Sequence, residues 1–220
     1  MPPAAGAQPR KSAPRDAAET SRRIIAAATS EFSERGYEGA RIERIVASAE
    51  SNVRMVYYYF GSKEGLYLAV LERIYEEIRG KEQQLALDHL PPIEAMASLV
   101  DFTFSHFADN LEFAQITLAE NLQRGQHVAK SSRIPEMSSP LIAQISALLR
   151  RGADAGVFRE DVDPLQLYVT IVALACHHIN NAHTLSATFG ADLRSPDWRS
   201  ARHTHARDVV LSYVMNLRPV

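Results

Sequence analysis

The sequence predicts an all-α protein with an N-terminal three-helix helix-turn-helix head and a larger C-terminal helical domain. Three observations predict this class. Apolar residues recur at spacings of three and four along most of the chain, and no segment shows the alternation of a convincing strand. Residues 41–63 contain two short amphipathic segments separated by a three-residue turn. We expect about nine helices, and 220 residues that are 46% hydrophobic suffice for two cores.

The N-terminal end predicts a disordered arm followed by one helix. Residues 1–18 are rich in Ala, Pro and basic side chains, and they lack the apolar core of a signal peptide. The first helix is expected over residues 19–35, with Gly36 as its end signal. Its inward face is expected to hold four apolar residues, namely Ile24, Ile25, Ala28 and Phe32.

The helix-turn-helix is expected at residues 41–63. Asn52 is the expected N-cap of the second helix, because asparagine accepts well from first-turn amides. The expected buried stripes are Ile42, Ile45, Val46 and Ala49 in the first helix and Val53, Val56 and Phe60 in the second. Such a motif places its second helix in the major groove of DNA, so the pattern predicts a DNA-binding protein.

Several polar and aromatic side chains are left on or near the outer face of the second helix. A cation and phenol hydroxyls can reach phosphates or base edges there. Lys63, at the start of the next helix, would lie beside free backbone amides, which is a favourable place for a phosphate. The other outer-face residues are Arg54, Met55, Tyr57 and Tyr59.

Three blocks of residues resemble the N-terminal domain of TetR/AcrR-family transcriptional regulators, and the resemblance covers about residues 19–80. The blocks are Phe32-Ser33-Glu34-Arg35-Gly36-Tyr37, Ile42 to Ala49, and Tyr57-Tyr58-Tyr59-Phe60-Gly61-Ser62-Lys63-Glu64. The resemblance implies that the first and third tyrosines of the last block contact DNA and that Tyr58 packs inward. It also implies base-reading positions at Val53, Arg54 and Met55 and a phosphate contact at Lys63.

The chain departs from the family pattern at two positions. Glu50 stands where many members have a glycine in the turn, and it is expected to point to solvent. Arg41 stands where many have a threonine, and a guanidinium could replace the hydroxyl contact with a charged one. Arg44, one turn later, is a second candidate for that phosphate. The full expected DNA-binding set is Arg41, Arg44, Asn52, Val53, Arg54, Met55, Tyr57, Tyr59 and Lys63.

The remaining helices define the domain organisation. Residues 19–64 are expected to form the DNA-binding domain and residues 65–90 the connecting segment, within a helix over 63–84. A ligand-binding and dimerisation domain is expected over 91–220, after Pro91-Pro92. Its helices are expected at 92–108, 110–124, 136–155, 163–187 and 198–217.

The last two helices are the expected homodimer interface, because paired helices from two subunits would place two heads symmetrically on a pseudo-palindromic operator. Small residues mark the first of them and apolar residues the second, namely Ala173, Ala175, Ala182 and Ala187, then Val209, Val210, Tyr213, Val214 and Leu217. The resemblance also implies a small-molecule effector in this domain. The candidate ligand-binding residues are Phe104, Phe107, Gln115, Asn121 and His178.

Other classes of protein receive little support. His177, His178 and His183 share a helix at spacings unsuited to chelation, so neither a metal site nor a cofactor is expected. No catalytic motif is present, and the single cysteine, Cys176, reads as a buried thiol. No apolar run is long enough to span a membrane, and a cytoplasmic location is expected. The net charge is −2, yet residues 1–63 carry ten Lys/Arg against seven Asp/Glu.

The sequence therefore predicts a non-enzymatic, sequence-specific transcriptional regulator, acting most simply as a ligand-responsive repressor. An activator or a corepressor-dependent regulator of the same fold remains open at this point. So do two proteins of other classes, a helical enzyme and a protein-interaction module. Neither of these gives a reason for the clustering of Arg54, Tyr57, Tyr59 and Lys63.

Overall fold

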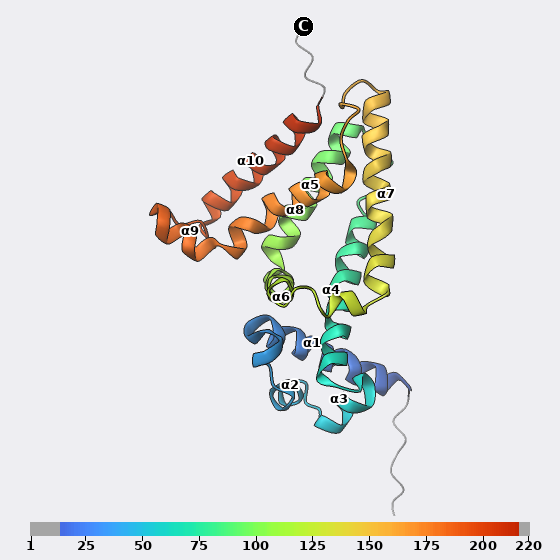
Figure 1. The fold of residues 1–220 in the computed structure, drawn as a ribbon, viewed down its shortest axis with the longest axis vertical. Helices are drawn as coiled ribbons and strands as arrows, with labels where there is room; N and C mark the ends of the chain where they lie inside the picture. Colours follow the sequence, from blue (N-terminus) through green and yellow to red (C-terminus); the bar gives the residue numbers. More distant parts are fainter. Residues whose placement is uncertain (1–13, 216–220) are drawn as a thin grey trace, which may run out of the picture. The chain divides into compact units, whose positions relative to one another are not determined.

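The computed structural model describes residues 14–215 and confirms the all-α class. Those residues form ten α-helices and one short 3₁₀-helix, and their only β pairing is an isolated bridge between Phe158 and Met215 (Figure 1). The chain divides after Val70 into two compact units. The division falls inside α4, within the segment expected to connect the domains. No helix in the described range is long and apolar enough to cross a membrane.

The first unit contains three helices and the start of a fourth. They are α1 (Pro14–Gly39), α2 (Ile42–Ser48), α3 (Val53–Phe60) and α4 (Lys63–Gln83). Phe32 of α1 is fully buried and packs edge-on against Tyr67 of α4, with ring centroids 4.8 Å apart. The expected stripe of α2 is confirmed, since Ile42, Ile45 and Val46 are buried together with Ala49.

The last five residues of the expected N-terminal arm are helical instead. Residues 14–18 belong to α1, while residues 1–13 lie outside the described range. Pro14 suits the first turn of a helix, where its missing N–H would have no partner, and the two alanines at 17 and 18 favour helix strongly. Local propensity therefore extends the helix beyond the start that the apolar stripe alone suggested.

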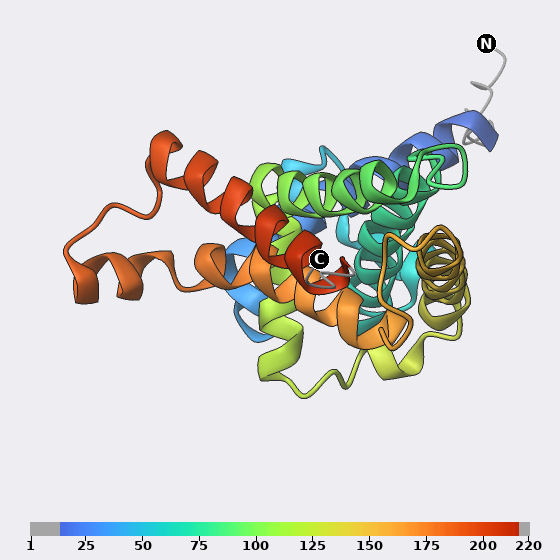
Figure 2. The ribbon, with the colours of Figure 1, turned by 90° about the horizontal axis from the view of Figure 1, so that it is seen from above.

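The second unit is built from the rest of α4 and six further helices. They are α5 (Pro92–Asp109), α6 (Leu111–Leu122), α7 (Arg133–Asp154), α8 (Pro164–Asn180), α9 (Ala182–Phe189) and α10 (Pro196–Val214). In both views α9 lies at the end of α8 and α10 that is farther from α7 (Figures 1 and 2). The core is one cluster to which α5, α7, α8 and α10 all contribute, including Met96, Leu99, Ile145, Leu148, Leu167, Ile171, Val210 and Val214.

The helix expected over residues 163–187 is two helices, which corrects the count from nine to ten within the described range. The break lies at Asn181. Its side-chain amide and its backbone N–H both donate to the carbonyl of His177, at 2.9 and 3.1 Å. Asparagine competes for backbone groups in this way and ends helices. The apolar periodicity continues across the break, so periodicity alone did not reveal it.

Gly36 sets the exit from α1. Its φ of 64° and ψ of 176° belong to a region that only glycine adopts readily. Nothing lies within 4 Å of the position that a Cβ would occupy, so the requirement comes from the backbone alone. The expected end signal after Arg35 is confirmed as a sharp kink, beyond which the helical turns continue to Gly39.

Replacing Gly36 by alanine is expected to lower the free energy of unfolding by about 1–3 kcal/mol, because alanine must hold a strained φ/ψ pair. Gly80→Ala is the matched control, since Gly80 lies inside α4 and its Cβ position is also open. That variant is expected to raise stability by up to about 1 kcal/mol through helix propensity. Urea unfolding of both variants tests the pair. Equal effects of the two changes would contradict the backbone argument.

Candidate DNA-binding surface and ligand cavity

The turn between α2 and α3 is closed by short-range hydrogen bonds. Asn52 Oδ1 accepts from the amide of Met55 at 3.2 Å, which confirms Asn52 as the N-cap of α3. The amide of Ser51 donates to the carbonyl of Val46 at 2.9 Å. Glu50 has a φ of 46°, which explains why glycine suits this position. Its side chain is exposed, as expected, and lies 3.7 Å from Arg23.

The exposed face of α3 differs from the expected one at Tyr58. This side chain is 76% exposed, so its expected place in the core is wrong. Tyr58 lies one helical turn after Arg54 and therefore shares its face, a relation that helix spacing alone could have shown. Met55 and Tyr59 are half-buried, on the side of the buried Val56. The solvent-facing residues of the cap and helix are Asn52, Val53, Arg54, Tyr57 and Tyr58.

Of the arginines expected to contact DNA, one is paired within the described part of the unit and two are not. Arg44 is held within the unit, since its Nε donates to Glu31 Oε1 at 2.7 Å and its Nη2 donates to the carbonyl of Gly39 at 2.8 Å. The hydrogen bond from Arg44 lowers the pKa of the Glu31 carboxyl. Arg41 and Arg54 are exposed, and neither forms an ion pair within residues 14–215.

Lys63 occupies the first turn of α4, as expected. Its ammonium lies 4.8 Å from the centre of the Tyr37 ring and 3.5 Å from the carbonyl of Glu38. Ser62 caps the same helix, because its Oγ accepts from the amide of Gly65 at 2.9 Å. Lys63 is therefore positioned beside a helix N-terminus, where a positive charge can join the backbone amides in binding a phosphate.

A cavity of about 360 Å³ lies in the second unit among α5, α6, α8, α9 and α10. Two of the five expected ligand residues, Gln115 and His178, line it. His178 is only 3% exposed, and neither ring nitrogen makes a hydrogen bond of full strength, since the backbone of Leu174 interacts with the imidazole only weakly. Burial, aided by the positive charge of Arg202, lowers the pKa of His178 to about 4. The imidazole is therefore neutral near pH 7.

The other three expected ligand residues are placed differently. Phe104 packs behind His178, with stacked rings whose centroids are 5.1 Å apart, and lines a neighbouring cavity of about 310 Å³. Phe107 is buried in an aromatic cluster with Phe113 and His106. Asn121 is exposed, and its amide donates to the carbonyl of Thr117 at 2.9 Å. A helical i, i+4 bond therefore uses the amide group that was expected to contact ligand.

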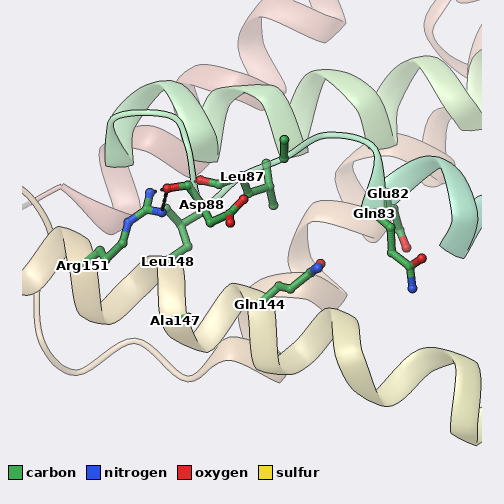
Figure 3. Close-up of a pocket in the computed structure, with 9 residues that line it drawn as sticks. Glu82, Gln83, Leu87, Asp88, Gln144, Ala147, Leu148 and Arg151 are labelled. Carbon is green, nitrogen blue, oxygen red and sulfur yellow. Dashed lines mark hydrogen bonds between the residues drawn. The ribbon is translucent and has the colours of Figure 1, made fainter.

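A third cavity, of about 340 Å³, lies between the end of α4 and α7 (Figure 3). Arg151 reaches across it and donates to the carbonyls of Leu87, Asp88 and Leu90 at 2.7 to 3.1 Å. Glu82, also in its wall, accepts from Arg79 Nη1 at 2.6 Å. The charged groups of this cavity are thus used by the protein itself.

A buried ionic network lies behind this cavity. Arg79 and Glu82 are both nearly inaccessible to solvent, and Arg79 Nη2 lies 3.0 Å from the hydroxyl of Tyr168. Burial raises the pKa of Glu82 to about 7, against the opposing effect of the adjacent guanidinium. The network joins α4 to α8. Removing one partner of such a pair is costly, because it leaves a buried charge without compensation.

The described residues meet neither the requirements of a metal site nor those of a reactive thiol. Residues 14–215 hold no group of three or more His, Cys, Asp or Glu side chains that could bind a metal ion. Cys176 is half-buried in α8, and burial raises the pKa of its thiol. A raised thiol pKa disfavours the thiolate, so this cysteine is a poor nucleophile.

Each of the two units matches the model of a known protein family. Residues 24–70 match the model for bacterial regulatory proteins of the tetR family. Residues 92–210 match the model for the tetracyclin repressor-like C-terminal domain. The chain therefore belongs to the TetR family of transcriptional regulators, which bind DNA through a helix-turn-helix and are not enzymes.

Individual relatives extend this similarity over most of the chain. The HTH-type transcriptional repressor NicS of Pseudomonas putida is 36% identical over 188 residues, covering 86% of this chain and 89% of that protein. The HTH-type transcriptional repressor SCO4008 of Streptomyces coelicolor is 29% identical, covering 74% and 80%. The fatty acid degradation regulator FadR of Bacillus halodurans shares the fold, with a TM-score of 0.68 at 19% identity, covering 95% and 99%.

The free energy of unfolding is expected to decrease in acid, because the unfolded chain protonates His178 more readily than the folded protein does. An unfolded histidine takes up a proton near pH 6.5, whereas folded His178 does so near pH 4. Its contribution is therefore present above pH 6.5 and is lost as the pH falls toward 4, at about 1.4 kcal/mol per pH unit. His106, whose pKa burial also lowers to about 4, acts in the same direction, and Glu82 acts in the opposite one.

The variant His178→Leu isolates this contribution. Its stability relative to the parent protein is expected to increase as the pH falls from 6.5 to 4, measured by urea unfolding at several pH values. A constant difference across that range would show that His178 does not titrate as its burial requires.

Proposed function

We propose that this protein is a cytoplasmic, homodimeric repressor that binds a pseudo-palindromic operator and releases it when a small molecule occupies the second unit. The observation that carries the proposal is the exposed face of α3. There Arg54, Tyr57 and Tyr58 project from a helix whose N-terminus is fixed by Asn52. Two relatives, NicS and SCO4008, are named as transcriptional repressors, and we propose the same role for this chain.

Arg54 is the proposed base-reading residue. It is exposed and has no ion pair within the described residues, so its guanidinium is available to bond both major-groove acceptors of guanine. Val53 and the tyrosines beside it can contact thymine methyl groups and phosphates. Arg41 and Lys63, at the starts of α2 and α4, are the proposed phosphate contacts. Met55 and Tyr59 are half-buried and act mainly by supporting this surface, and Arg44 is no longer proposed as a contact.

A dimer through α8 and α10 is supported by large apolar residues that remain partly exposed in the described chain. Leu165 and Val169 lie one turn apart on α8 and are 55% and 56% exposed. Val209 and Tyr213 lie one turn apart on α10 and are 38% and 47% exposed. Val210 and Val214, also expected at the interface, are buried in the subunit's own core. Two such helices from each subunit would form a four-helix interface.

Ligand response is proposed to act through the spacing of the two heads. α4 runs as one helix from Lys63 to Gln83, so it belongs to both units. A ligand that binds better to one arrangement of the second unit shifts the population toward that arrangement. About 5.5 kcal/mol of differential affinity would convert a 1:99 population into 99:1, and smaller shifts need less.

Selection of bound fragments from the source genome at near-physiological salt is the primary test. Enrichment of a short pseudo-palindrome is expected, with Arg54→Ala then losing about 1–3 kcal/mol of binding free energy at one base pair in each half-site. Arg150→Ala removes the same charge from an exposed position on α7 and is the matched control. Equal losses for all sequences in the Arg54 variant would make that residue a phosphate contact instead.

The double variant Val169→Glu, Val209→Glu is expected to be monomeric by light scattering, because it places charge on both proposed interface helices. Its operator affinity is expected to fall by about two orders of magnitude or more, since the second head no longer benefits from a high effective concentration. Leu122→Glu is the matched control, because Leu122 is an exposed leucine on α6, outside the proposed interface. A variant that remains dimeric would move the interface elsewhere.

A further inference from the structure

The cavity beside α9 has an unusual combination of wall residues. Most of its lining is apolar, including Leu111, Leu118 and Leu193. The exception is His178, a buried imidazole that makes no hydrogen bond of full strength and has only a weak interaction with the backbone of Leu174. A buried polar group without a partner is costly and rare, because it has lost its water and gained nothing in return. The missing partners of His178 point to a ligand.

Two aromatic rings contact the ring of His178. It stacks on Phe104 with an interplanar angle of 13°, and the indole of Trp198 lies 5.5 Å away. Phe104 stacks in turn on His203, whose Nε2 lies 2.9 Å from Asp101 Oδ1. The orientation of the imidazole is therefore set before any ligand arrives. A neutral imidazole presents one donor and one acceptor, and His178 lines the cavity, so its donor can bond an oxygen of the ligand once a small movement of the wall exposes the nitrogen.

Positive charge near the cavity is not balanced by the protein. Arg199 lines the cavity and has one long hydrogen bond, of 3.4 Å, to the carbonyl of Ala108. Arg202, close enough to lower the pKa of His178, has one of the same length to the carbonyl of Leu174. Neither guanidinium pairs with a carboxylate within the described residues. The arginine of the cavity between α4 and α7 is in a different situation, because Arg151 donates to three backbone carbonyls.

We propose that this cavity binds a small organic anion, an apolar molecule carrying one carboxylate, which is held by Arg199 and His178. The inference rests on the proposed function, for which this molecule is the effector. A volume of about 360 Å³ filled at the density of a protein interior holds up to about eighteen non-hydrogen atoms, which suffices for a small aromatic or aliphatic acid. The apolar wall receives the body of the molecule, and the guanidinium and imidazole receive its carboxylate. A cationic ligand would be repelled by Arg199 and Arg202.

The test is calorimetric titration of the full-length protein, freed of bound small molecules by unfolding and refolding. The probes are benzoate, phenylacetate and hexanoate, each compared with its own primary amide and with the amine of the same carbon skeleton. At least one acid is expected to bind at least about tenfold more tightly than its amide, with no binding of the amine. Arg199→Gln and His178→Leu are each expected to weaken binding of that acid by about tenfold or more.

Controls separate this proposal from the function on which it rests. Arg150→Gln, on the exposed face of α7, is expected to bind the acid as the parent protein does. His178→Leu keeps a side chain of similar volume and removes no hydrogen bond of full strength, so the folded variant remains available for titration. The parent protein's binding to its selected operator is measured in the same preparation.

Two outcomes would overturn the anion site. In one, no acid binds more tightly than its amide. In the other, an acid binds equally well to the parent protein and to both variants. If the parent protein still binds its operator in either case, the regulator function stands without this effector class. Acid binding that depends on Arg199, in a protein that selects no DNA sequence, would support the site and contradict the proposed function.

Discussion

An eight-residue helix is too short to keep its shape alone in water, and the proposed recognition of DNA depends on one such helix, α3. Its stability must come from its ends and from a narrow contact with the rest of the unit. Asn52 satisfies an amide at its start, Gly61 ends it, and Val56 is its one fully buried side chain. Arg54, Tyr57 and Tyr58 can therefore face outward without weakening the helix, because they are exposed and do not hold it in place.

In the second unit, a few polar side chains connect two of the helices. Arg79, Glu82 and Tyr168 join α4 to α8 through contacts that are largely withdrawn from water. Arg79 and Glu82 both belong to α4, so separating α4 from α8 would keep that ion pair but remove the Tyr168 hydroxyl from it, and a lost hydrogen bond to a charged group costs about 1.5–3 kcal/mol. The two helices therefore behave as a pair. Since α8 is also the proposed interface helix, a change at that interface would be felt by α4 more readily than by a helix held through apolar contacts alone.

Periodicity predicted most of the fold, because the core of each unit is a set of apolar stripes on helices. The stripe from Ile42 to Ala49 and the cap at Asn52 follow from local chemistry, which one segment of sequence contains. The break at Asn181 was missed because apolar spacing continues through it. The ion pair of Arg44 was not predicted, because its partner, Glu31, lies thirteen residues earlier and no local pattern reveals that pair.

The candidate sites were predictable to different degrees for the same reason. The outer face of α3 depends on one helix, so spacing could have placed Tyr58 beside Arg54, although the family resemblance assigned it inward. The cavity depends on five helices, and only two of its five expected residues line it. Arg199 gave no signal in the sequence, since an arginine on an amphipathic helix is ordinarily a solvated charge. Its environment arises only when α10 packs near α5.

Trp198, the single tryptophan of the chain, lies against His178 at the wall of the cavity. Indole emission shifts with the polarity of its surroundings, and here the whole of that emission comes from one position. The protein thus carries an intrinsic optical probe at the place where we expect its effector. Filling the cavity would be visible in the unmodified chain, without attaching a dye, and the same signal could be followed while the protein is bound to DNA.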